Sequence, residues 1–206
     1  PSCTIDGDFT NAIGTGANDT VNTIALDADD RIFAGGHFTQ FNNLSAARAV
    51  RIERNGTVIA DGGFNPAFNN VVLSLLVLPE GKLVAGGYFT SYGGEGGPNY
   101  LVSLNANGTA NSAFDTGSGP DDTVHSLFRL GNGSILVGGR FSTYNSTTSR
   151  RLVRVSSAGA IEAGETGFVV GHGFDAPGID IAPTVTDVAA TADGSVVLAL
   201  GQFTTY

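Results

Sequence analysis

The chain has 206 residues, of which 41% are apolar, and its 19 Asp and Glu against 10 Lys and Arg give a formal net charge of −9. This length and apolar content allow a substantial buried core. The scarcity of basic residues argues against nucleic acid and anionic membranes as partners, because both bind basic surfaces. No apolar run approaches the roughly 18 residues that a membrane-spanning helix needs, so we expect no membrane insertion. Cys3 is the only cysteine, which excludes an internal disulfide and a cluster of thiolate metal ligands.

The first predicted element, in residues 1–15, is the closing strand of a blade whose earlier strands would lie upstream. Its marker is Phe9, which follows an aspartate. Later units of the chain also end on a phenylalanine, so Phe9 occupies the position that closes a unit.

A single pattern then recurs over residues 16–68, 69–118 and 119–178, and it begins again over 179–206. Each copy opens with an apolar run that leads into a two-residue turn. The four turns are Asp29-Asp30, Glu80-Gly81, Asn132-Gly133 and Asp193-Gly194. Asn, Asp and Gly tolerate the positive φ of a tight hairpin, so each turn predicts a pair of antiparallel strands.

A second apolar run follows each turn and ends in two glycines, a variable residue, and Phe-Thr or Phe-Ser. We interpret the glycine pairs as places where two backbones approach closely. The fourth copy departs from the pattern, because Leu200-Gly201 replaces the glycine pair. Two more short apolar runs complete a copy, which then closes on Phe64, Phe114 or Phe174. The third copy carries an insertion between Glu162 and Pro183.

Four short strands per unit, repeated at a period of about 50 residues, are typical of a β-propeller blade. No long stretch shows the apolar spacing of about 3.6 residues that marks an amphipathic helix, and the 30 glycines disfavour helices further. The sequence therefore predicts an all-β, β-propeller-like array of four-stranded antiparallel blades, with about three full repeats and partial blades at both ends. Closed propellers need about four to eight blades, so we expect a piece of a longer chain. A short, imperfect ring is the alternative.

The third copy carries the pattern most completely, from Val124 through Asn132-Gly133, Gly138-Gly139 and Phe141 to Phe174-Asp175. This pattern resembles the delta-60 repeat, a propeller-forming repeat found mainly in large secreted or surface proteins. The resemblance extends over nearly the whole chain. It implies a propeller fold and an extracellular or cell-surface location, and it implies no reaction.

Catalytic chemistry has little support in the sequence. The three histidines, His37, His125 and His172, stand at three different repeat positions, without the spacing of a zinc site. No Gly-x-Ser-x-Gly nucleophile motif is present. The glycine pairs also lack the Lys-Ser/Thr that follows a phosphate-binding loop. We therefore expect no enzyme activity, no catalytic residue and no cofactor.

Calcium is the one alternative to a cofactor-free chain. Three carboxylates cluster in one turn, at Asp27, Asp29 and Asp30, and two more stand at Asp121-Asp122. Loop carboxylates of this kind are calcium ligands. However, the first cluster aligns with turns that share only the requirements of a hairpin, so turn formation is the competing interpretation.

The variable position of the four copies is a candidate binding face. It holds His37, Tyr88, Arg140 and Gln202. Strand alternation places this residue opposite its Phe neighbour, so we expect the Phe side chains to pack between blades and the variable side chains to point away. An exposed strand end without function is the competing interpretation. Nearby aromatic residues recur at one site, where we expect inter-blade core in preference to a sugar-stacking platform: Phe41, Tyr92, Tyr144 and Tyr206.

Six Asn-x-Ser/Thr triplets raise the question of N-glycosylation. Three of them coincide with hairpin turns, which explain them without a glycan: Asn55, Asn107 and Asn132. Asn43 and Asn145 lie in the same loop of two copies and are, with Asn18, the candidate glycosylation sites.

The sequence best fits a non-catalytic structural and interaction module of a larger extracellular or cell-surface protein, such as a surface filament or appendage. An adhesin module that binds carbohydrate or protein is the alternative, and a propeller lyase or glycosidase is a third hypothesis. A partial ring leaves apolar blade faces and strand edges uncovered. We therefore expect other parts of the same long chain or neighbouring subunits as partners, along with glycans, and self-association of the isolated segment.

Overall fold

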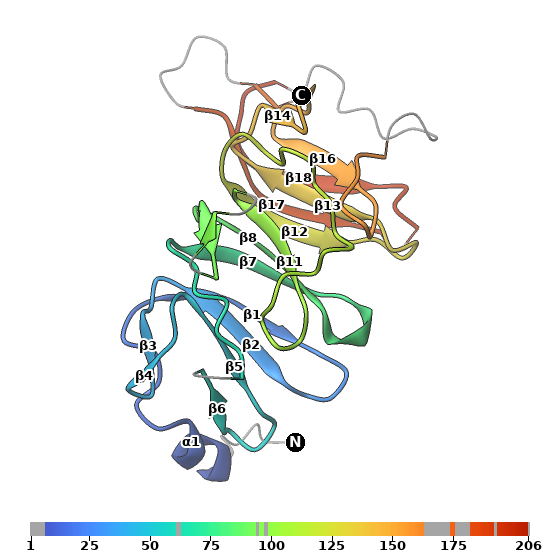
Figure 1. Ribbon diagram of the computed structural model, residues 1–206. Helices are drawn as coiled ribbons and strands as arrows, with labels where there is room; N and C mark the ends of the chain where they lie inside the picture. Colours follow the sequence, from blue (N-terminus) through green and yellow to red (C-terminus); the bar gives the residue numbers. More distant parts are fainter. Residues whose placement is uncertain are drawn as a thin grey trace.

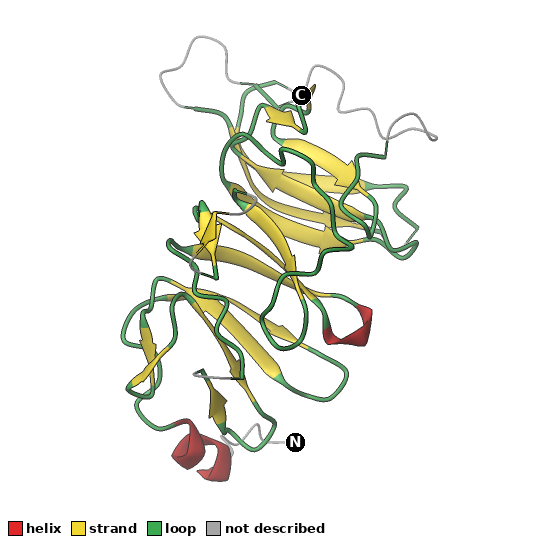
Figure 2. Cartoon of the chain, in the orientation of Figure 1, coloured by secondary structure: helices red, strands yellow, loops and turns green. Residues whose placement is uncertain are grey.

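The computed structural model describes residues 7–60, 63–93, 95–96, 99–162, 174–175, 182–191 and 193–205. These residues form an all-β fold, with one short helix, α1 (Gly7–Ile13), and one 3-10 turn, η1 (Pro79–Gly81) (Figure 2). Neither of these helices is long and apolar enough to cross a membrane. Cys3, His172, Tyr206 and most of the third-copy insertion lie outside the described residues.

The strands form four antiparallel sheets, one in each copy of the repeat. The first sheet contains β1 (Val21–Leu26), β2 (Ile32–Gly36), β5 (Ala49–Ile52) and β6 (Val58–Ile59), in that spatial order. The second contains β7 (Val72–Val77), β8 (Leu83–Gly87) and β11 (Leu101–Leu104). The third contains β12 (Val124–Arg129), β13 (Ile135–Gly139) and β16 (Leu152–Val155). The fourth contains β17 (Thr184–Ala190) and β18 (Val197–Gln202).

The expected fourth strand is complete only in the first blade. In the second and third blades it is reduced to single bridges, between Leu104 and Ala110 and between Val155 and Ile161. The outermost strand has a partner on one side only, so few ladder hydrogen bonds hold it. Three small hairpins connect the second and third strands of the blades: β3 (Gln40–Phe41) with β4 (Leu44–Ser45), β9 (Ser91–Tyr92) with β10 (Glu95–Gly96), and β14 (Thr143–Tyr144) with β15 (Thr147–Thr148).

The predicted hairpins are confirmed, but their turns are longer than the predicted two residues. In the first blade, for example, the last hydrogen bond of the hairpin runs from Asp27 N–H to the Arg31 carbonyl, with residues 28–30 between them. The second residue of each predicted pair has a positive φ: 59° at Asp30, 69° at Gly81, 94° at Gly133 and 71° at Gly194. Each turn therefore reverses the chain between the first and second strands of its blade.

The blades follow one another in chain order, from the first blade beside α1 to the fourth at the opposite end of the array (Figure 1). Their first strands contact one another in succession, β1 with β7, β7 with β12 and β12 with β17. This arrangement is the one that places first strands along the inner edge of a propeller. The sheets of the described residues form an open array, without closure into a ring.

The first glycine of each pair lies against a valine of the next blade. A Cβ built on Gly86 would lie 2.5 Å from Cγ1 of Val124, and one built on Gly35 would lie 2.7 Å from Cγ1 of Val72. Gly138 and Val185 repeat this contact at 2.8 Å. The expected close approach at the glycine pairs is thus confirmed, and the approaching group is a valine side chain from the following blade.

The second glycine of each pair meets the backbone of its own blade. A Cβ on Gly36, Gly87 or Gly139 would lie 2.1–2.2 Å from the carbonyl oxygen of the residue before the first strand, and one on Gly201 would lie 1.9 Å from that of Thr184, the first residue of β17. A β-bulge lies at this point in all four first strands, between Val21 and Thr23 in the first blade, for example. Glycine therefore permits both the bulge and the packing of the next blade.

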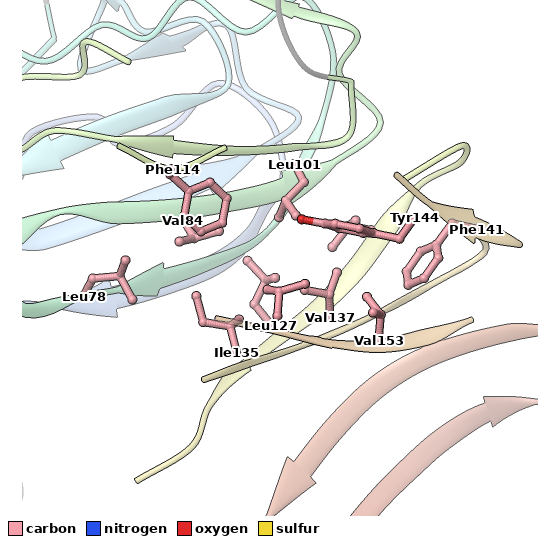
Figure 3. Packing of buried hydrophobic residues seen from close by; sticks show 12 residues of the cluster. Leu78, Val84, Leu101, Phe114, Leu127, Ile135, Val137, Phe141, Tyr144 and Val153 are labelled. Atoms are coloured by element: carbon pink, nitrogen blue, oxygen red, sulfur yellow. The ribbon is translucent and has the colours of Figure 1, made fainter. Parts of the chain in front are cut away.

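Apolar side chains fill each space between blades. Figure 3 shows the cluster between the second and third blades, where Leu78 and Val84 of the second pack with Ile135 and Val137 of the third. Similar clusters lie between the first and second blades and between the third and fourth. The core of this fold is therefore divided into layers, one for each pair of neighbouring blades.

The closing phenylalanines belong to these layers. Phe64 is 1% exposed and packs edge-on against Phe33, with ring centroids 5.3 Å apart. Phe114 lies in the cluster between the second and third blades, and Phe174 packs against Phe203 of the fourth. Each unit thus ends by placing an aromatic ring against the following interface.

The strand predicted in residues 1–15 is wrong in secondary structure, because helix α1 (Gly7–Ile13) lies there. Phe9 and Ile13 are four residues apart, so both lie on one helix face. That face packs against the apolar cluster of the first blade. Phe9 still approaches Gly56 as Phe64 approaches Gly108, so the closing phenylalanine keeps its place although its backbone is helical.

We predict that Gly86→Ala lowers the free energy of unfolding by about 1–3 kcal/mol, because its Cβ would overlap the Val124 side chain. Combining it with Val124→Ala should cost less than the sum of the two single changes, since the second relieves the overlap made by the first. Urea denaturation measures all three variants. Gly7→Ala is the control, because nothing lies within 4 Å of its new Cβ. Strictly additive effects would contradict this packing.

Candidate functional site

We call the two glycines, the variable residue and the following Phe-Thr or Phe-Ser of each copy the cassette. The variable residues of the cassettes stand at the same edge of the array, just after the second glycine of each blade. Backbone N–H groups fix their positions: His37 donates to the carbonyl of Thr20 (2.8 Å) and Tyr88 to that of Val71 (2.9 Å). Arg140 makes the corresponding hydrogen bond in the third blade. All four side chains, His37, Tyr88, Arg140 and Gln202, are exposed. The adjoining Phe38, Phe89 and Phe141 are fully buried, as predicted.

The four variable residues are not gathered into one cluster, since each belongs to a different blade. One pair is connected through a residue that the sequence analysis did not associate with this face. His125 occupies the bulge of β12, and its ring meets that of Tyr88 edge-on at a centroid distance of 5.9 Å. This contact joins the second blade to the third.

Charged groups complete the cluster around His125. Nε of Arg140 lies 3.9 Å from Oδ2 of Asp122, while Oδ1 of Asp122 accepts a hydrogen bond from Thr123 N–H at 2.6 Å. Burial, and secondarily the charge of Arg140, lower the pKa of His125 below its usual range. The imidazole is therefore neutral at pH 7, and its Nε2 atom is buried without a hydrogen-bond partner.

The bulge position differs in the other blades. Asn22 uses it to donate a hydrogen bond from Nδ2 to the carbonyl of Val72 at 3.1 Å, across the first interface. Leu73 and Thr186 occupy it in the second and fourth blades. Among the described residues, only the junction of the second and third blades thus combines the rings of a tyrosine and a histidine with an Arg–Asp ion pair. An aromatic edge beside a guanidinium and a carboxylate can bind a polar ligand group.

The aromatic residues that follow the variable position belong to the core, as predicted for the three that the structure describes. Tyr144 is fully buried, and its hydroxyl donates a hydrogen bond to the Gly159 carbonyl at 2.8 Å. Phe41 is also buried, and Tyr92 packs against the cluster between the first two blades. The buried rings of Phe41 and Tyr144 are therefore unavailable as sugar-stacking platforms, whereas the ring of Tyr92 is half-buried.

An Asn/Asp clamp, made of Asn18, Asn69 and Asp121, holds the segment that follows the variable residue in each of the first three blades. Oδ1 of Asn69 accepts hydrogen bonds from the N–H groups of Thr90 (2.9 Å) and Ser91 (3.1 Å), and its Nδ2 donates to Thr90 Oγ1. Asn18 binds Thr39 and Gln40 in the same way. Asp121 accepts the corresponding backbone hydrogen bonds from Ser142 and Thr143, but its Oδ2 accepts a hydrogen bond from Ser142 Oγ where the asparagines donate one.

The clamp explains why Thr or Ser follows the cassette phenylalanine, since their N–H and hydroxyl groups bind it. Sequence analysis missed it, although its signal is visible. Asn or Asp stands three positions before the first valine of three copies, at Asn18, Asn69 and Asp121. A clamp residue and the segment it binds are far apart in the chain, so neither local spacing nor motif matching connects them.

The candidate glycosylation sites differ in their surroundings. Asn43 and Asn145 both lie in the turns of small hairpins, but Asn42 is the structural counterpart of Asn145. Each of these two accepts a hydrogen bond at 3.2 Å from a preceding loop, from Thr15 N–H and Ser118 N–H. Asn43 is exposed at the next turn position, whereas both polar atoms of the Asn18 side chain are engaged in the clamp.

The three turn sequons have the geometry expected of hairpin turns. Oδ1 of Asn55 accepts a hydrogen bond from the N–H two residues later, at 3.0 Å, and Asn107 and Asn132 do the same. Their side chains thus stabilise the turn itself.

The carboxylates proposed as calcium ligands face arginines. Oδ2 of Asp27 lies 2.6 Å from Nε of Arg31, and Oδ1 accepts hydrogen bonds from two backbone N–H groups. Although burial opposes ionisation, these hydrogen bonds hold the pKa of Asp27 below its usual range. Asp29 pairs with Arg31, and Asp30 pairs with Arg54. No group of three or more His, Cys, Asp or Glu that could hold a metal occurs within the part of the chain that the structure describes.

We predict that Asp121→Ala lowers the free energy of unfolding by about 1–2 kcal/mol at pH 7, because three hydrogen bonds are lost. Burial opposes ionisation of Asp121, but hydrogen bonds from Ser142 and Thr143 outweigh it and lower the pKa of this carboxyl. Its contribution to stability is therefore present above the unfolded-state pKa and is lost as the pH falls through the folded-state pKa.

Asp121→Asn is the matched control, because asparagine makes the same clamp in the first two blades. We expect this variant to stay within about 1 kcal/mol of the parent at pH 7 and to lose less stability between pH 5 and pH 3. Urea denaturation across that range measures both effects. An equal loss of stability on acidification in the parent and in Asp121→Asn would show that Asp121 is not the titrating group.

The fold agrees with comparisons to other proteins. A family model described as "Domain of unknown function (DUF5122) beta-propeller" matches residues 28–58, 78–114 and 130–164. Each segment runs from a hairpin turn through the glycine pair and the variable residue of one blade. No curated protein matches the chain.

A solved structure supports the same architecture. The WD40 β-propeller domain of Doa1 aligns with 90% of this chain at a TM-score of 0.56 and 15% identity, and the chain spans 49% of that domain. A protein of unknown function from Bacteroides caccae aligns with 68% of this chain and 46% of its own length, at 16% identity and a TM-score of 0.38. At these identities the first likeness concerns the fold alone. The three segments matched by the family model cover half of the residues, and the chain therefore belongs to the DUF5122 β-propeller family.

Proposed function

We propose that this chain is a non-catalytic structural and interaction module of a larger extracellular or cell-surface protein, in which further blades or neighbouring subunits cover its two end faces. The observation that carries the proposal is the exposure of large apolar side chains at the two ends of the array. The resemblance to the delta-60 repeat supports the cell-surface location.

The first of these surfaces is the N-terminal face, formed by Val21, Ile24 and Leu26 of β1. Ile24 is 70% exposed and Leu26 is 64% exposed. In the second blade, Leu75 takes the place of Ile24 and is 8% exposed, because the first blade covers it. The N-terminal face thus has the composition of an inter-blade contact without its partner.

The second surface is the C-terminal face, formed by Val196, Leu198 and Leu200 around β18. Leu198 is 58% exposed, whereas its counterparts on the second strands of the other three blades are fully buried. These counterparts are Phe33, Val84 and Leu136, each covered by the blade that follows. Full burial of a side chain of this size contributes about 1.5–3 kcal/mol, so covering either face would be strongly favourable.

The positions of the histidines also support a module that acts by assembly instead of by catalysis. The two histidines that the structure describes, His37 and His125, lie on different blades, and Nε2 of His125 is buried away from any substrate. A general acid or base must reach the proton that it transfers. A lyase or glycosidase is therefore the least supported of the three hypotheses.

We predict that the 206-residue chain self-associates through its end faces and binds a hydrophobic dye. The variant Ile24→Lys/Leu26→Lys/Leu198→Lys should be monomeric and bind less dye, because charges replace the apolar groups. Leu44→Lys is the control: this leucine is 40% exposed but belongs to the small β3–β4 hairpin and should leave association unchanged. Sedimentation velocity measures the mass. A parent chain that stays monodisperse and resists heat would overturn the proposal.

A glycan- or protein-binding adhesin module remains the second candidate, and the Tyr88–His125–Arg140 cluster favours it. If this cluster binds a ligand, Tyr88→Ala and Arg140→Ala should each remove binding on a panel of neutral and acidic oligosaccharides while leaving self-association unchanged. Gln202→Ala is the matched control, since Gln202 is exposed at the same repeat position but outside the cluster. Equal binding by all three variants would exclude the variable face as the site.

A further inference from the structure

The C-terminal face differs from the three internal interfaces at one residue. In the pairing of first and second strands, Gly35 lies opposite Thr23, and Gly86 and Gly138 lie opposite Ser74 and Ser126. In the fourth blade the residue at this place is Leu200, opposite Asp187. Leu200 therefore stands where each internal interface has the glycine that meets a valine.

The backbone of the fourth blade keeps the geometry of the others. The bulge between Val185 and Asp187 matches the bulges of the first three blades. Gly201 also approaches the carbonyl of Thr184, just as Gly36 approaches that of Thr20. The change at Leu200 is thus a local difference in side-chain volume on an unchanged strand.

That difference decides which blade can pack on the C-terminal face. At the internal glycines, a Cβ would lie 2.5–2.8 Å from valine Cγ1. Cβ to valine Cβ distances would be 3.1 Å at Gly35 and Gly86 and 3.6 Å at Gly138, so even alanine would be crowded opposite a leucine. A leucine adds three more carbon atoms at this point. A blade that carries valine on its first strand, such as the first blade of a second copy with Val21, cannot pack there in the same pose.

We propose that the C-terminal face binds a blade of the same type whose first strand carries glycine where the internal blades carry Val72, Val124 and Val185. Leu200 then fills the space that the valine fills elsewhere, with the large and small residues exchanged between the two blades. Such an exchange keeps the total side-chain volume of an interface. Leu200 is therefore a specificity-determining residue that weakens head-to-tail addition of further copies of this chain relative to addition of a blade with glycine at that place.

This inference rests on the proposed function, because it assumes that blades cover the end faces. The two proposals differ in content, because the end faces could be covered by other blades without any selection by Leu200. The internal interfaces supply the argument for the occupant. A hydrogen bond from a backbone N–H to a hydroxyl of the preceding blade joins two of these interfaces, from Leu75 N–H to Thr23 Oγ1 and from Val188 N–H to Ser126 Oγ, both at 3.2 Å. The valine contact recurs at all three interfaces, and β18 presents the next position of the same interface.

Two end-blocked forms of the full chain test the proposal. Ile24→Lys/Leu26→Lys leaves only the C-terminal face available, and Leu198→Lys leaves only the N-terminal face. Mixed together, these forms can pair head-to-tail only one-to-one, and each form measured alone shows any pairing between two like faces. Sedimentation equilibrium at several concentrations gives the dissociation constant, and circular dichroism with urea denaturation confirms that each variant is folded.

Four pairings separate the outcomes. The first form, which keeps Leu200, should bind the second form, which keeps Val21, only weakly. Val21→Gly in the second form should lower the dissociation constant at least tenfold. Leu200→Gly in the first form should also lower the dissociation constant for the second form with its native Val21. When Leu200→Gly in the first form is combined with Val21→Gly in the second, the gain in affinity should be lost, because both large side chains are absent. Equal dissociation constants in the four pairings, or no pairing in any of them, would overturn the role of Leu200. Loss of the proposed function shows separately, as a parent chain that does not self-associate at all.

Discussion

The contact between a bare glycine backbone and a valine methyl group governs the architecture of this chain. Glycine lets the first strand of one blade approach the second strand of the blade before it, and the contact recurs at Gly35–Val72, Gly86–Val124 and Gly138–Val185. Because the approach is limited by atoms in van der Waals contact, it fixes the separation of neighbouring blades. The apolar layers, the bulges and the row of variable residues all take their positions from that separation.

The few residues of each cassette have two different roles, packing between blades and display at the surface. The glycines and phenylalanine are buried and carry the packing, and Thr or Ser binds the Asn/Asp clamp. The residue between them, such as Tyr88 or Arg140, is left exposed in a segment whose backbone is held on both sides. A surface position supported in this way can change its side chain at little cost to the fold, which suits a module that displays different groups on a common frame.

Repetition made much of this structure predictable from the sequence. Hairpins at Asn132-Gly133, close approach at the glycine pairs and burial of Tyr144 each follow from a residue type that recurs at a fixed position. Features that depend on a neighbouring blade were harder to predict. The Tyr88–His125 contact joins different repeat positions across an interface. Helix α1 replaced an expected strand because the described residues offer its backbone no strand partner, while its apolar face still had a cluster to cover.

The closing phenylalanines have a consequence for how such an array can grow or shrink. Phe64 ends one unit in sequence but packs inside the layer that the next blade completes. A cut placed at a hairpin turn would separate a layer from its aromatic ring and leave a void on one side. An array that is shortened at one end keeps its last layer filled only if the break spares the phenylalanine that belongs to that layer. The unit that must stay whole for packing is therefore offset from the visible blade.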